Sequence, residues 1–301
     1  MKIGCDLIRD LKMYKLPLEK FRQFNDRLVF IDPNKLPSDN ILNDIEIYIG
    51  DRITTDMVKY MPNLKWIHLT CVGVDKLLGL DRNDIIITNS KGIMDKSVIS
   101  TILAFMFSLS RGINYCLKEN LDRYKFDRYF DNIQAIDNQT CLIVGMGNIG
   151  NKLKSILELL NINVVGIKSD NADDLIHLIK DADFVINLLP LTNKTKDIFN
   201  KKIFEYMQKS SYFINVGRGQ TVVEEDLIYA LKHNIIAGAA LDVFEHEPLS
   251  LDSDLWNLKN VILTPHVAGL SKDYWDKEYE LFLENYKRYQ NSKEMLNYVK
   301  L

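Results

Sequence analysis

Short apolar runs alternate with longer segments of helical spacing along almost the whole chain. Runs of this length fit β-strands, and their alternation with amphipathic segments favours an α/β fold over an all-β fold. In the first part of the chain, strands are predicted at 2–5, 27–31, 45–49, 66–69 and 85–88. A second series is predicted at 140–144, 163–167, 184–188, 212–215, 237–241 and 261–263. Six strands joined by helices are the strand count of a doubly wound dinucleotide-binding fold.

Three further segments have patterns of their own. Residues 97–111 are apolar at nearly every position, which predicts a helix that is buried on all sides. Residues 114–138 are polar and rich in Tyr, Asp and Arg, so we expect them to cross the surface between two packed units. Residues 272–289 have an amphipathic pattern that predicts a helix. Its apolar side chains stand roughly in line at Trp275, Tyr279, Leu283 and Tyr286.

Composition and charge narrow the classes of function. The chain has 301 residues, of which 47% are hydrophobic and 26% charged, as in a typical globular protein of about two domains. Its 38 basic and 41 acidic side chains leave a net charge of −3. Nucleic acids and anionic membranes require a clustered basic surface, so we expect neither as a partner.

The cysteines and the apolar runs bear on the compartment. The four cysteines are far apart, without metal-ligand spacing or a disulfide framework, at Cys5, Cys71, Cys116 and Cys141. Cys5 and Cys141 lie in strand-like runs and are expected to be buried. The longest apolar run, 102–109, is far shorter than the ~20 residues that span a bilayer, and the N-terminus lacks a signal-peptide core. We therefore expect a cytoplasmic protein without a metal site.

The sharpest local signal is a G-x-G-x-x-G sequence at 145–150, between a predicted strand and a helical pattern. Gly145 permits a tight turn, Gly147 lets the backbone approach a pyrophosphate, and Gly150 allows close packing of helix on strand. Asn148 and Ile149 open the helix, whose free N–H groups and positive dipole end suit phosphates. A merely structural turn, or the similar turn of a methyltransferase, is the alternative.

The residues at the expected ribose-binding position differ from those of an NAD site. NAD sites carry an acid about 20 residues beyond the glycines, at the end of the second strand. Here Lys168 and Ser169 stand there, and Lys168 lies 18 residues beyond Gly150. A cation and a hydroxyl suit a 2′-phosphate better than a bare diol, which favours NADP over NAD. Asp170 is the alternative, because a small loop shift would bring it to the ribose.

Three later segments place chemically useful side chains just after predicted strands. Arg218, the acids of the segment 242–248 and His266 each follow a different strand of the second series. Ligands of a doubly wound sheet bind outside the carboxyl ends of its strands, so all three point to the edge that the glycine turn occupies. Arg can hold a carboxylate and polarise a carbonyl, His can donate a proton near neutral pH, and Glu can orient the imidazole.

Each of these residues also has an ordinary structural interpretation. An Arg after a strand is more often a surface or salt-bridge residue, and a single His is more often structural. Glu245 competes with Glu247 as the partner of His266. The other histidines are interpreted as structural or surface residues, with His246 as a weak rival for catalysis: His68, His177, His233 and His246. The conjunction of the three segments outweighs the separate structural interpretations.

The sequence resembles the D-isomer-specific 2-hydroxyacid dehydrogenases. The motifs that carry the resemblance are GMGNIG at 145–150, INLLPLT at 186–192, INVGRG at 214–219, GAALDVFEHEPL at 238–249 and LTPHVAG at 263–269. They cover residues 90–270 well, and CVGVD at 71–75 extends the resemblance more loosely towards the N-terminus.

The resemblance implies a role for individual residues. Arg218 would bind the carboxylate and carbonyl of a small 2-oxo acid, and His266 would transfer the proton, paired with Glu247, which precedes the proline. Asp242 would contact the nicotinamide carboxamide. Further cofactor contacts are implied at Leu189, Pro190, Thr192, Val216, Gly217 and Gly269. Val72 and Gly73 match the loop whose backbone N–H groups hold the substrate carboxylate.

The resemblance also implies an arrangement that composition does not show. Two doubly wound domains, Rossmann-like and flavodoxin-like, would enclose a cleft that closes on substrate and excludes water. The substrate-binding domain would comprise residues 1–92 and 270–301, and the dinucleotide-binding domain residues 93–269. Members of the family are commonly dimers through the cofactor domain, so we expect a homodimer.

Three departures from the family pattern stand out. Ile99-Ser100 follows Val98 where Ala-Glu is usual, residues 137–140 read Asp-Asn-Gln-Thr where the family has Gly-Lys-Thr, and Lys168 replaces the NAD acid. The first two affect substrate-side contacts and local packing, and none affects the catalytic trio. We therefore expect a nicotinamide-dependent reductase of the glyoxylate, hydroxypyruvate or phosphoglycerate type. The alternatives are a dinucleotide-sensing corepressor on the same fold and a methyltransferase, which leaves VGRG and TPHVAG unexplained.

Overall fold

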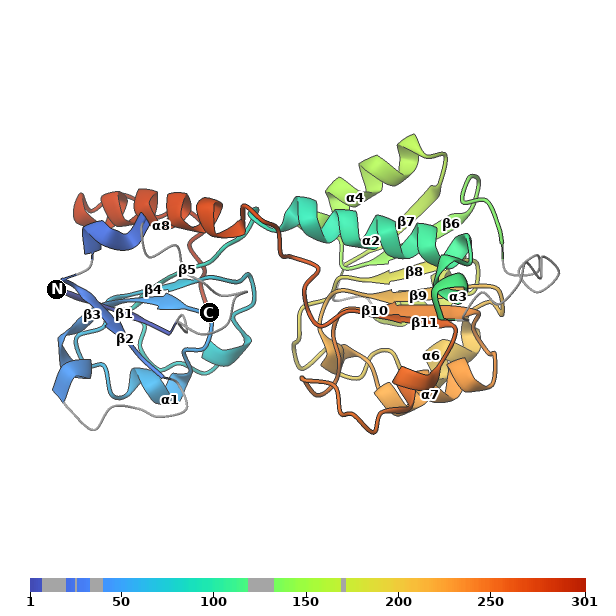
Figure 1. The fold of residues 1–301 in the computed structure, drawn as a ribbon, viewed down its shortest axis with the longest axis horizontal. Coiled ribbons are helices and arrows are strands. Elements are labelled where there is room, and N and C mark those ends of the chain that lie inside the picture. Colours follow the sequence, from blue (N-terminus) through green and yellow to red (C-terminus); the bar gives the residue numbers. More distant parts are fainter. Residues whose placement is uncertain (7–19, 25, 33–39, 119–132, 169–171) are drawn as a thin grey trace. The chain divides into compact units, whose positions relative to one another are not determined.

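The computed structural model describes residues 1–6, 20–24, 26–32, 40–118, 133–168 and 172–301 (Figure 1). These residues form two compact units. One unit comprises Met1–Met94 and Ser271–Leu301, and the other Asp95–Leu270. Every predicted strand is present, with ends that differ from the prediction by at most one residue. Both sheets are parallel and flanked by helices, which confirms the predicted α/β class.

The first unit is built on a five-stranded sheet in the order β2-β1-β3-β4-β5. This is the flavodoxin-like order, in which the chain changes direction across the sheet between β1 and β3. The elements are β1 (Lys2–Cys5), β2 (Leu28–Phe30), β3 (Ile45–Gly50), α1 (Thr55–Val58), β4 (Trp66–Leu69), β5 (Ile86–Thr88) and α8 (Tyr274–Gln290).

Helix α8 closes one face of this sheet, although it follows β5 by almost two hundred residues. Alternate side chains of β4 point to opposite faces, so Trp66 reaches α8 whereas Ile67 packs on the α1 side. The Trp66 ring stacks on Phe282 of α8, with 5.3 Å between ring centroids. Of the predicted apolar line, Tyr286 is buried and the other three side chains pack beside it, with Phe282 at the centre.

The second unit is built on a six-stranded sheet in the order β11-β10-β9-β8-β6-β7. The strands are β6 (Thr140–Val144), β7 (Asn163–Ile167), β8 (Phe184–Asn187), β9 (Tyr212–Asn215), β10 (Gly238–Leu241) and β11 (Val261–Leu263). Strand β6 pairs with β7 on one side and β8 on the other. The carboxyl ends of β6 and β8 therefore form the point of reversal where such folds bind ligands.

Helices cover both faces of the second sheet (Figure 1). They are α2 (Asp95–Ser110), α3 (Ile113–Lys118), α4 (Asn148–Leu159), α5 (Ala172–Ile179), α6 (Lys201–Tyr206) and α7 (Glu224–Lys232). Helices α2 and α4 pack on one face and α5 to α7 on the other, over the larger apolar core. Cys141 is buried in β6 and Cys5 in β1, as predicted, and none of the four cysteines forms a disulfide.

Two expectations about the connecting segments need correction or qualification. Helix α2 is buried along one face only, because Val98, Ile102 and Phe105 pack inward whereas Phe107 remains exposed. An apolar composition therefore did not mean burial on all sides. The predicted surface crossing at 114–138 begins with the last residues of α3, and its stretch 119–132 lies outside the described residues.

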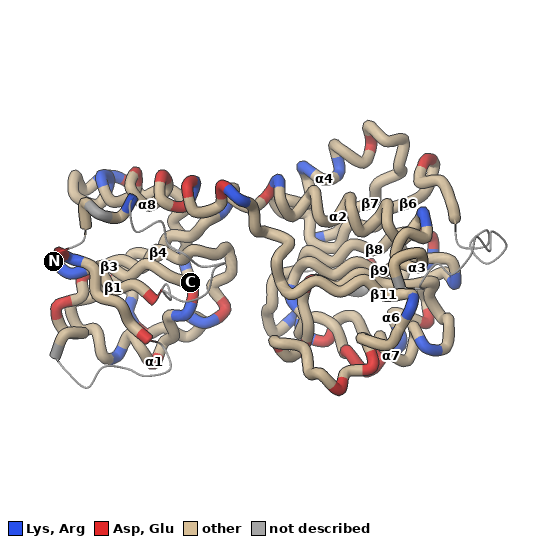
Figure 2. Tube along the Cα trace, viewed as in Figure 1, with Lys and Arg blue, Asp and Glu red and all other residues tan. Residues whose placement is uncertain are grey.

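Basic and acidic residues are interspersed along the chain in both units (Figure 2), in keeping with the near-zero net charge. In the described part of the chain, no helix is both long enough and apolar enough to cross a membrane.

Candidate active site

The glycine turn links the carboxyl end of β6 to the first turn of α4. Gly145 has φ +113°, and a Cβ there would lie 2.8 Å from the Leu188 carbonyl carbon, so both conformation and space require glycine. A Cβ on Gly150 would lie 2.8 Å from the Gly145 carbonyl oxygen. Gly147 caps α4 without a side-chain hydrogen bond and has open space around it. The turn therefore fits a pyrophosphate against the N–H groups of Asn148 and Ile149.

The end of β7 lies directly beside this turn. The backbone N–H groups of Gly145 and Met146 both donate to the carbonyl of Ile167, at 2.9 and 3.0 Å. Lys168 follows Ile167 and is exposed. Lys168, the cation predicted at the ribose position, thus lies next to the glycine turn. Ser169 and Asp170 fall in the stretch 169–171 that the structure does not describe.

Two buried asparagines, which sequence reasoning missed, shape the loops after β8 and β9. Asn187 donates to the Asn215 side chain at 3.0 Å and accepts from the Leu189 N–H at 3.0 Å. Asn215 also accepts from the Gly217 N–H at 3.1 Å. A Cβ on Gly217 would lie 2.8 Å from the Leu189 carbonyl oxygen, so the two loops cross in contact. A polar Asn at the end of two otherwise apolar strands is the signal that could have revealed them.

The predicted cofactor residues of these loops lie at the same carboxyl edge. Leu189 is buried, whereas Pro190 and Thr192 are exposed. Thr195, which was not predicted, fixes this loop because its hydroxyl donates to the Pro190 carbonyl at 2.6 Å and accepts from the Thr192 N–H at 2.8 Å. Val216 begins the neighbouring loop, with its N–H 3.3 Å from the Asn187 carbonyl oxygen.

Arg218 lies on a loop that crosses the loop after β10 in direct contact. A Cβ on Gly219 would lie 1.8 Å from the Phe244 carbonyl oxygen, so only glycine fits the crossing. The Gln220 side chain donates to the Glu245 carbonyl at 2.9 Å and ties the two loops together. The Arg218 guanidinium donates to the Gly217 carbonyl at 2.9 Å. The fixed crossing thereby sets where Arg218 lies relative to the loop that carries Glu247.

His266 is presented by a loop that the buried Asp242 organises. The Asp242 carboxylate accepts from the Thr264 hydroxyl at 2.5 Å and from the N–H groups of Val267 and Ala268 at 2.9 Å. The His266 N–H donates to the Asp242 carbonyl at 2.8 Å. His266 itself has φ +54°, a left-handed conformation that is uncommon outside glycine. Gly269 ends this loop and is half-buried.

Glu247 and His266 form the hydrogen-bonded pair expected from the sequence. The Glu247 carboxylate lies 2.7 Å from Nδ1 of His266, and its other oxygen accepts from the Phe244 N–H at 3.1 Å. The side chains are 34% and 50% exposed, so the pair opens to solvent. Partial burial disfavours ionisation of Glu247, but His266, the Phe244 amide and the Arg218 charge outweigh it and lower the Glu247 pKa.

The structure thus brings Arg218, Glu247 and His266 to one edge of the second unit. The rivals do not join them. The Glu245 side chain accepts from the Glu224 N–H at 3.4 Å, His246 is exposed, and His68 is buried in the other unit. Val72 and Gly73 follow β4 of the first unit, where the Asn89 side chain donates to the Val72 carbonyl at 2.9 Å.

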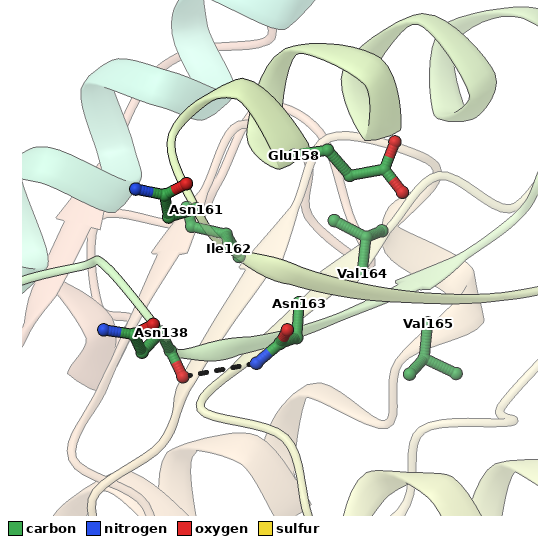
Figure 3. Close-up of a pocket in the computed structure, with 7 residues that line it drawn as sticks. All are labelled: Asn138, Glu158, Asn161, Ile162, Asn163, Val164 and Val165. Carbon is green, nitrogen blue, oxygen red and sulfur yellow. Dashed lines mark hydrogen bonds between the residues drawn. The ribbon is translucent and has the colours of Figure 1, made fainter.

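A separate hollow of about 550 Å³ lies near the amino ends of β6 and β7 (Figure 3). Asn138, Glu158 and residues 161–165 line it, and Asn163 donates to the Asn138 carbonyl at 3.4 Å. These residues precede or begin β6 and β7, whereas the glycine turn follows the end of β6, so the hollow is not part of the site. Among the described residues, no three His, Cys, Asp or Glu side chains gather as a metal site would require.

Known proteins resemble both the sequence and the fold. The family model for the D-isomer specific 2-hydroxyacid dehydrogenase, NAD binding domain, matches residues 103–268. A glyoxylate/hydroxypyruvate reductase B of Salmonella paratyphi A is 31% identical over 244 residues, which are 74% of this chain and 74% of the relative.

Two solved structures extend the likeness to the whole chain. An acyclic imino acid reductase, solved in complex with NADPH and D-Arg, has a TM-score of 0.83, 25% identity and full coverage of both chains. A D-isomer specific 2-hydroxyacid dehydrogenase family protein of Klebsiella pneumoniae has a TM-score of 0.84 and 24% identity, over 100% of this chain and 97% of that one.

Proposed function

The chain belongs to the D-isomer specific 2-hydroxyacid dehydrogenase family, and from this premise we propose that it reduces glyoxylate or hydroxypyruvate with NADPH. The family match gives the reaction class, an NAD(P)-dependent oxidoreductase that interconverts 2-oxo and 2-hydroxy acids. The choice of a small substrate follows the name of the Salmonella relative, and the choice of NADPH follows Lys168 and the NADPH-bound structural neighbour.

The observation that carries the proposal is the Glu247–His266 pair beside Arg218, on the same sheet edge as the glycine turn. The nicotinamide, when bound, supplies the hydride to the carbonyl carbon. His266, oriented through Nδ1 by Glu247, donates the proton to the carbonyl oxygen. Arg218 holds the substrate carboxylate with its planar fork of donors. The hydride and the proton together convert the 2-oxo acid into the 2-hydroxy acid.

The remaining predicted contacts are proposed on the family pattern. We propose that unit Asp95–Leu270 binds the dinucleotide and that the other unit binds the substrate carboxylate through the backbone N–H groups of Val72 and Gly73. We also propose that Asp242 accepts from the nicotinamide carboxamide while it holds the His266 loop.

A substrate panel tests the proposed activity. NADPH and NADH oxidation is followed with glyoxylate, hydroxypyruvate, pyruvate and longer 2-oxo acids, with and without a primary amine. The amine arm is included because one structural neighbour reduces imino acids. We expect the fastest turnover with glyoxylate and hydroxypyruvate. Nucleotide binding without any turnover would instead favour the corepressor-like alternative.

Variants of the trio test the assigned roles. Arg218→Met and His266→Gln are each expected to lower kcat/KM by ~10²-fold or more. Substitution of the rival His246 by Gln serves as the control, with kcat/KM within about twofold of wild type. Unchanged kinetics in the His266 variant would remove this residue from the reaction.

Lys168 is the test of cofactor choice. Lys168→Asp places a carboxylate where a 2′-phosphate would bind, and we expect preference to move from NADPH towards NADH by ~10-fold or more. The readout is the ratio of kcat/KM for the two nucleotides. A ratio that stays the same would assign the 2′-position to other residues.

We further propose a homodimer formed through the second unit. Helices α2 and α3 leave Phe107, Ile113 and Leu117 exposed, and Leu117 is 81% exposed. Apolar surface of this kind is typical of a protein interface. Light scattering after size exclusion is expected to give twice the 34.9 kDa chain mass, and Leu117→Glu is expected to favour the monomer. A monomeric wild type would contradict this proposal.

A cytoplasmic location is also proposed, since none of the four cysteines forms a disulfide, as is usual in a reducing compartment. Fractionation of the producing cells, with the protein detected by antibody, tests it. Recovery outside the cytoplasmic fraction would overturn it.

A further inference from the structure

A buried carboxylate lies against the first turn of the helix that follows the glycine turn. Asp95, the first residue of α2, is 3% exposed. Its Oδ2 accepts from Nζ of Lys152 at 2.5 Å and from the side-chain amide of Asn148. Asn148 begins α4 and Lys152 lies one turn further along it, and α2 and α4 pack side by side (Figure 1).

This placement creates an electrostatic conflict at the phosphate-binding end of α4. The N-terminus of a helix attracts anions, and a pyrophosphate bound there would meet the negative charge of Asp95. A buried carboxylate without a counter-ion also carries a large desolvation penalty. The ammonium of Lys152 contacts the Asp95 carboxylate, so it offsets both the repulsion of a pyrophosphate and the desolvation penalty. The Lys152 side chain itself is 52% exposed.

We propose that Lys152 sets the affinity for the dinucleotide by neutralising Asp95 at the first turn of α4. Asp95 in turn is a positioning residue, since its bond to Asn148 occupies that side chain and leaves the first-turn N–H groups to the pyrophosphate. Lys152 is distinct from the glycines, which shape the turn, and from Lys168, which lies at the ribose end. The inference rests on the dinucleotide binding proposed above.

The alternative is that the pair only ties α2 to α4. The two interpretations differ in how charge and salt affect binding. If Lys152 offsets a repulsive charge, its removal weakens binding, removal of both charges restores it, and salt screens the deficit. A purely structural tie predicts lower thermal stability without a salt-dependent change in the Kd of the folded protein.

The experiment measures the Kd of NADPH by fluorescence titration of the full chain at low and high salt. Lys152→Met is expected to raise Kd ~10-fold at 0.05 M salt, with a clearly smaller ratio to wild type at 0.5 M. Lys152→Arg and the double variant Asp95→Asn/Lys152→Met are expected to stay within about threefold of wild type.

Lys154→Met is the matched control. Lys154 lies on the same helix but pairs with Glu158 at 2.8 Å, so its removal takes the same charge from α4 without exposing Asp95. Its Kd is expected to stay within about threefold of wild type. Equal weakening by both Lys variants, an unchanged Lys152→Met, or a double variant as weak as Lys152→Met would each overturn the inference. A wild type that binds neither NADPH nor NADH would instead contradict the proposed function.

Discussion

His266 shows how the backbone of a single residue is fixed by hydrogen bonds to a neighbouring loop. Its left-handed backbone, with φ +54°, persists because its N–H donates to the Asp242 carbonyl and the Asp242 carboxylate holds Val267 and Ala268. Strained conformations of this kind survive only where the surroundings enforce them. The imidazole therefore meets Glu247 with its direction already set, and substrate binding at the proposed site would cost it little conformational freedom.

Asp6, at the end of β1 in the other unit, is a residue with an unusual titration. Its Oδ2 accepts from the Tyr48 hydroxyl at 2.7 Å and the Arg52 N–H at 2.6 Å, whereas its Oδ1 has no hydrogen-bond partner among the described residues. Burial, reinforced by the charge of Asp51, raises the pKa of Asp6 to about 6 despite these hydrogen bonds.

The raised pKa gives a stability prediction with a definite sign. Between pH 4 and 6 the folded state holds a proton that the unfolded state has released, so the free energy of unfolding falls as pH rises through this window. Asp6→Asn removes the effect, and we expect it to raise the free energy of unfolding by about 2 kcal/mol at pH 7.5 and by little below pH 4. Urea unfolding at both pH values measures this. A gap that does not depend on pH would contradict it.

At the scale of elements, backbone crossings decide where the loops of the site lie. Gly219→Ala would place a Cβ within 1.8 Å of the Phe244 carbonyl oxygen, and backbone on both sides cannot yield easily. We expect a lower free energy of unfolding, by ~2 kcal/mol or more, together with loss of activity, because Arg218 and the Glu247 loop are displaced.

Gly147→Ala is the contrasting substitution. Nothing lies within 4 Å of a Cβ there, and the backbone is extended, so stability should be nearly unchanged while the approach of a pyrophosphate is hindered. Thermal unfolding and NADPH titration of both variants separate the two effects. Equal destabilisation of both variants would mean that the crossing at Gly219 has no special importance.

The pairing of α8 with β4 includes a buried His68–Glu278 contact, with 3.6 Å between Nε2 and a carboxylate oxygen. Removing one partner from such a pair leaves a polar group buried alone, whereas replacing both can be nearly neutral. Glu278→Leu is therefore expected to lower the free energy of unfolding by ~3 kcal/mol, and His68→Leu/Glu278→Leu to recover most of it. Chemical denaturation of the single and double variants measures this, and a strictly additive double variant would contradict the coupling.

The strands were predictable from sequence because each is a short apolar run bounded by polar residues, as β6 and β9 show. The glycine turn was predictable from its local spacing, and strand ends indicated that Arg218 and His266 share one edge. The choice of Glu247 over Glu245 as the partner of His266 came from the family resemblance. The one-sided burial of α2 was not, since it depends on which elements pack against the helix. Asn187, Asn215 and Asp95 were missed because their partners lie on distant segments that only the folded sheet brings together.

At the scale of the whole molecule, we expect ligand binding to distinguish the two units. The proposed dinucleotide site consists of residues of the second unit alone. A dinucleotide at 100 times its Kd stabilises the unit that binds it by about 2.7 kcal/mol. For a unit of this size we expect its unfolding midpoint to rise by roughly 5–10 °C, while any separate transition of the other unit shifts less. Differential scanning calorimetry with NADPH tests this, with adenosine at the same concentration as the control without phosphates. An equal shift with adenosine would mean that the phosphates contribute nothing.

The discontinuity of the first unit has a consequence for synthesis on the ribosome. Strands β1 to β5 emerge first, but α8, whose Phe282 covers Trp66, is translated only after the whole segment Asp95–Leu270. The second unit is continuous and can complete its core during translation, whereas the first must wait with an uncovered aromatic sheet face. The nascent chain therefore exposes a hydrophobic surface for the time needed to translate about 180 residues, and this interval is where chaperones would act on it.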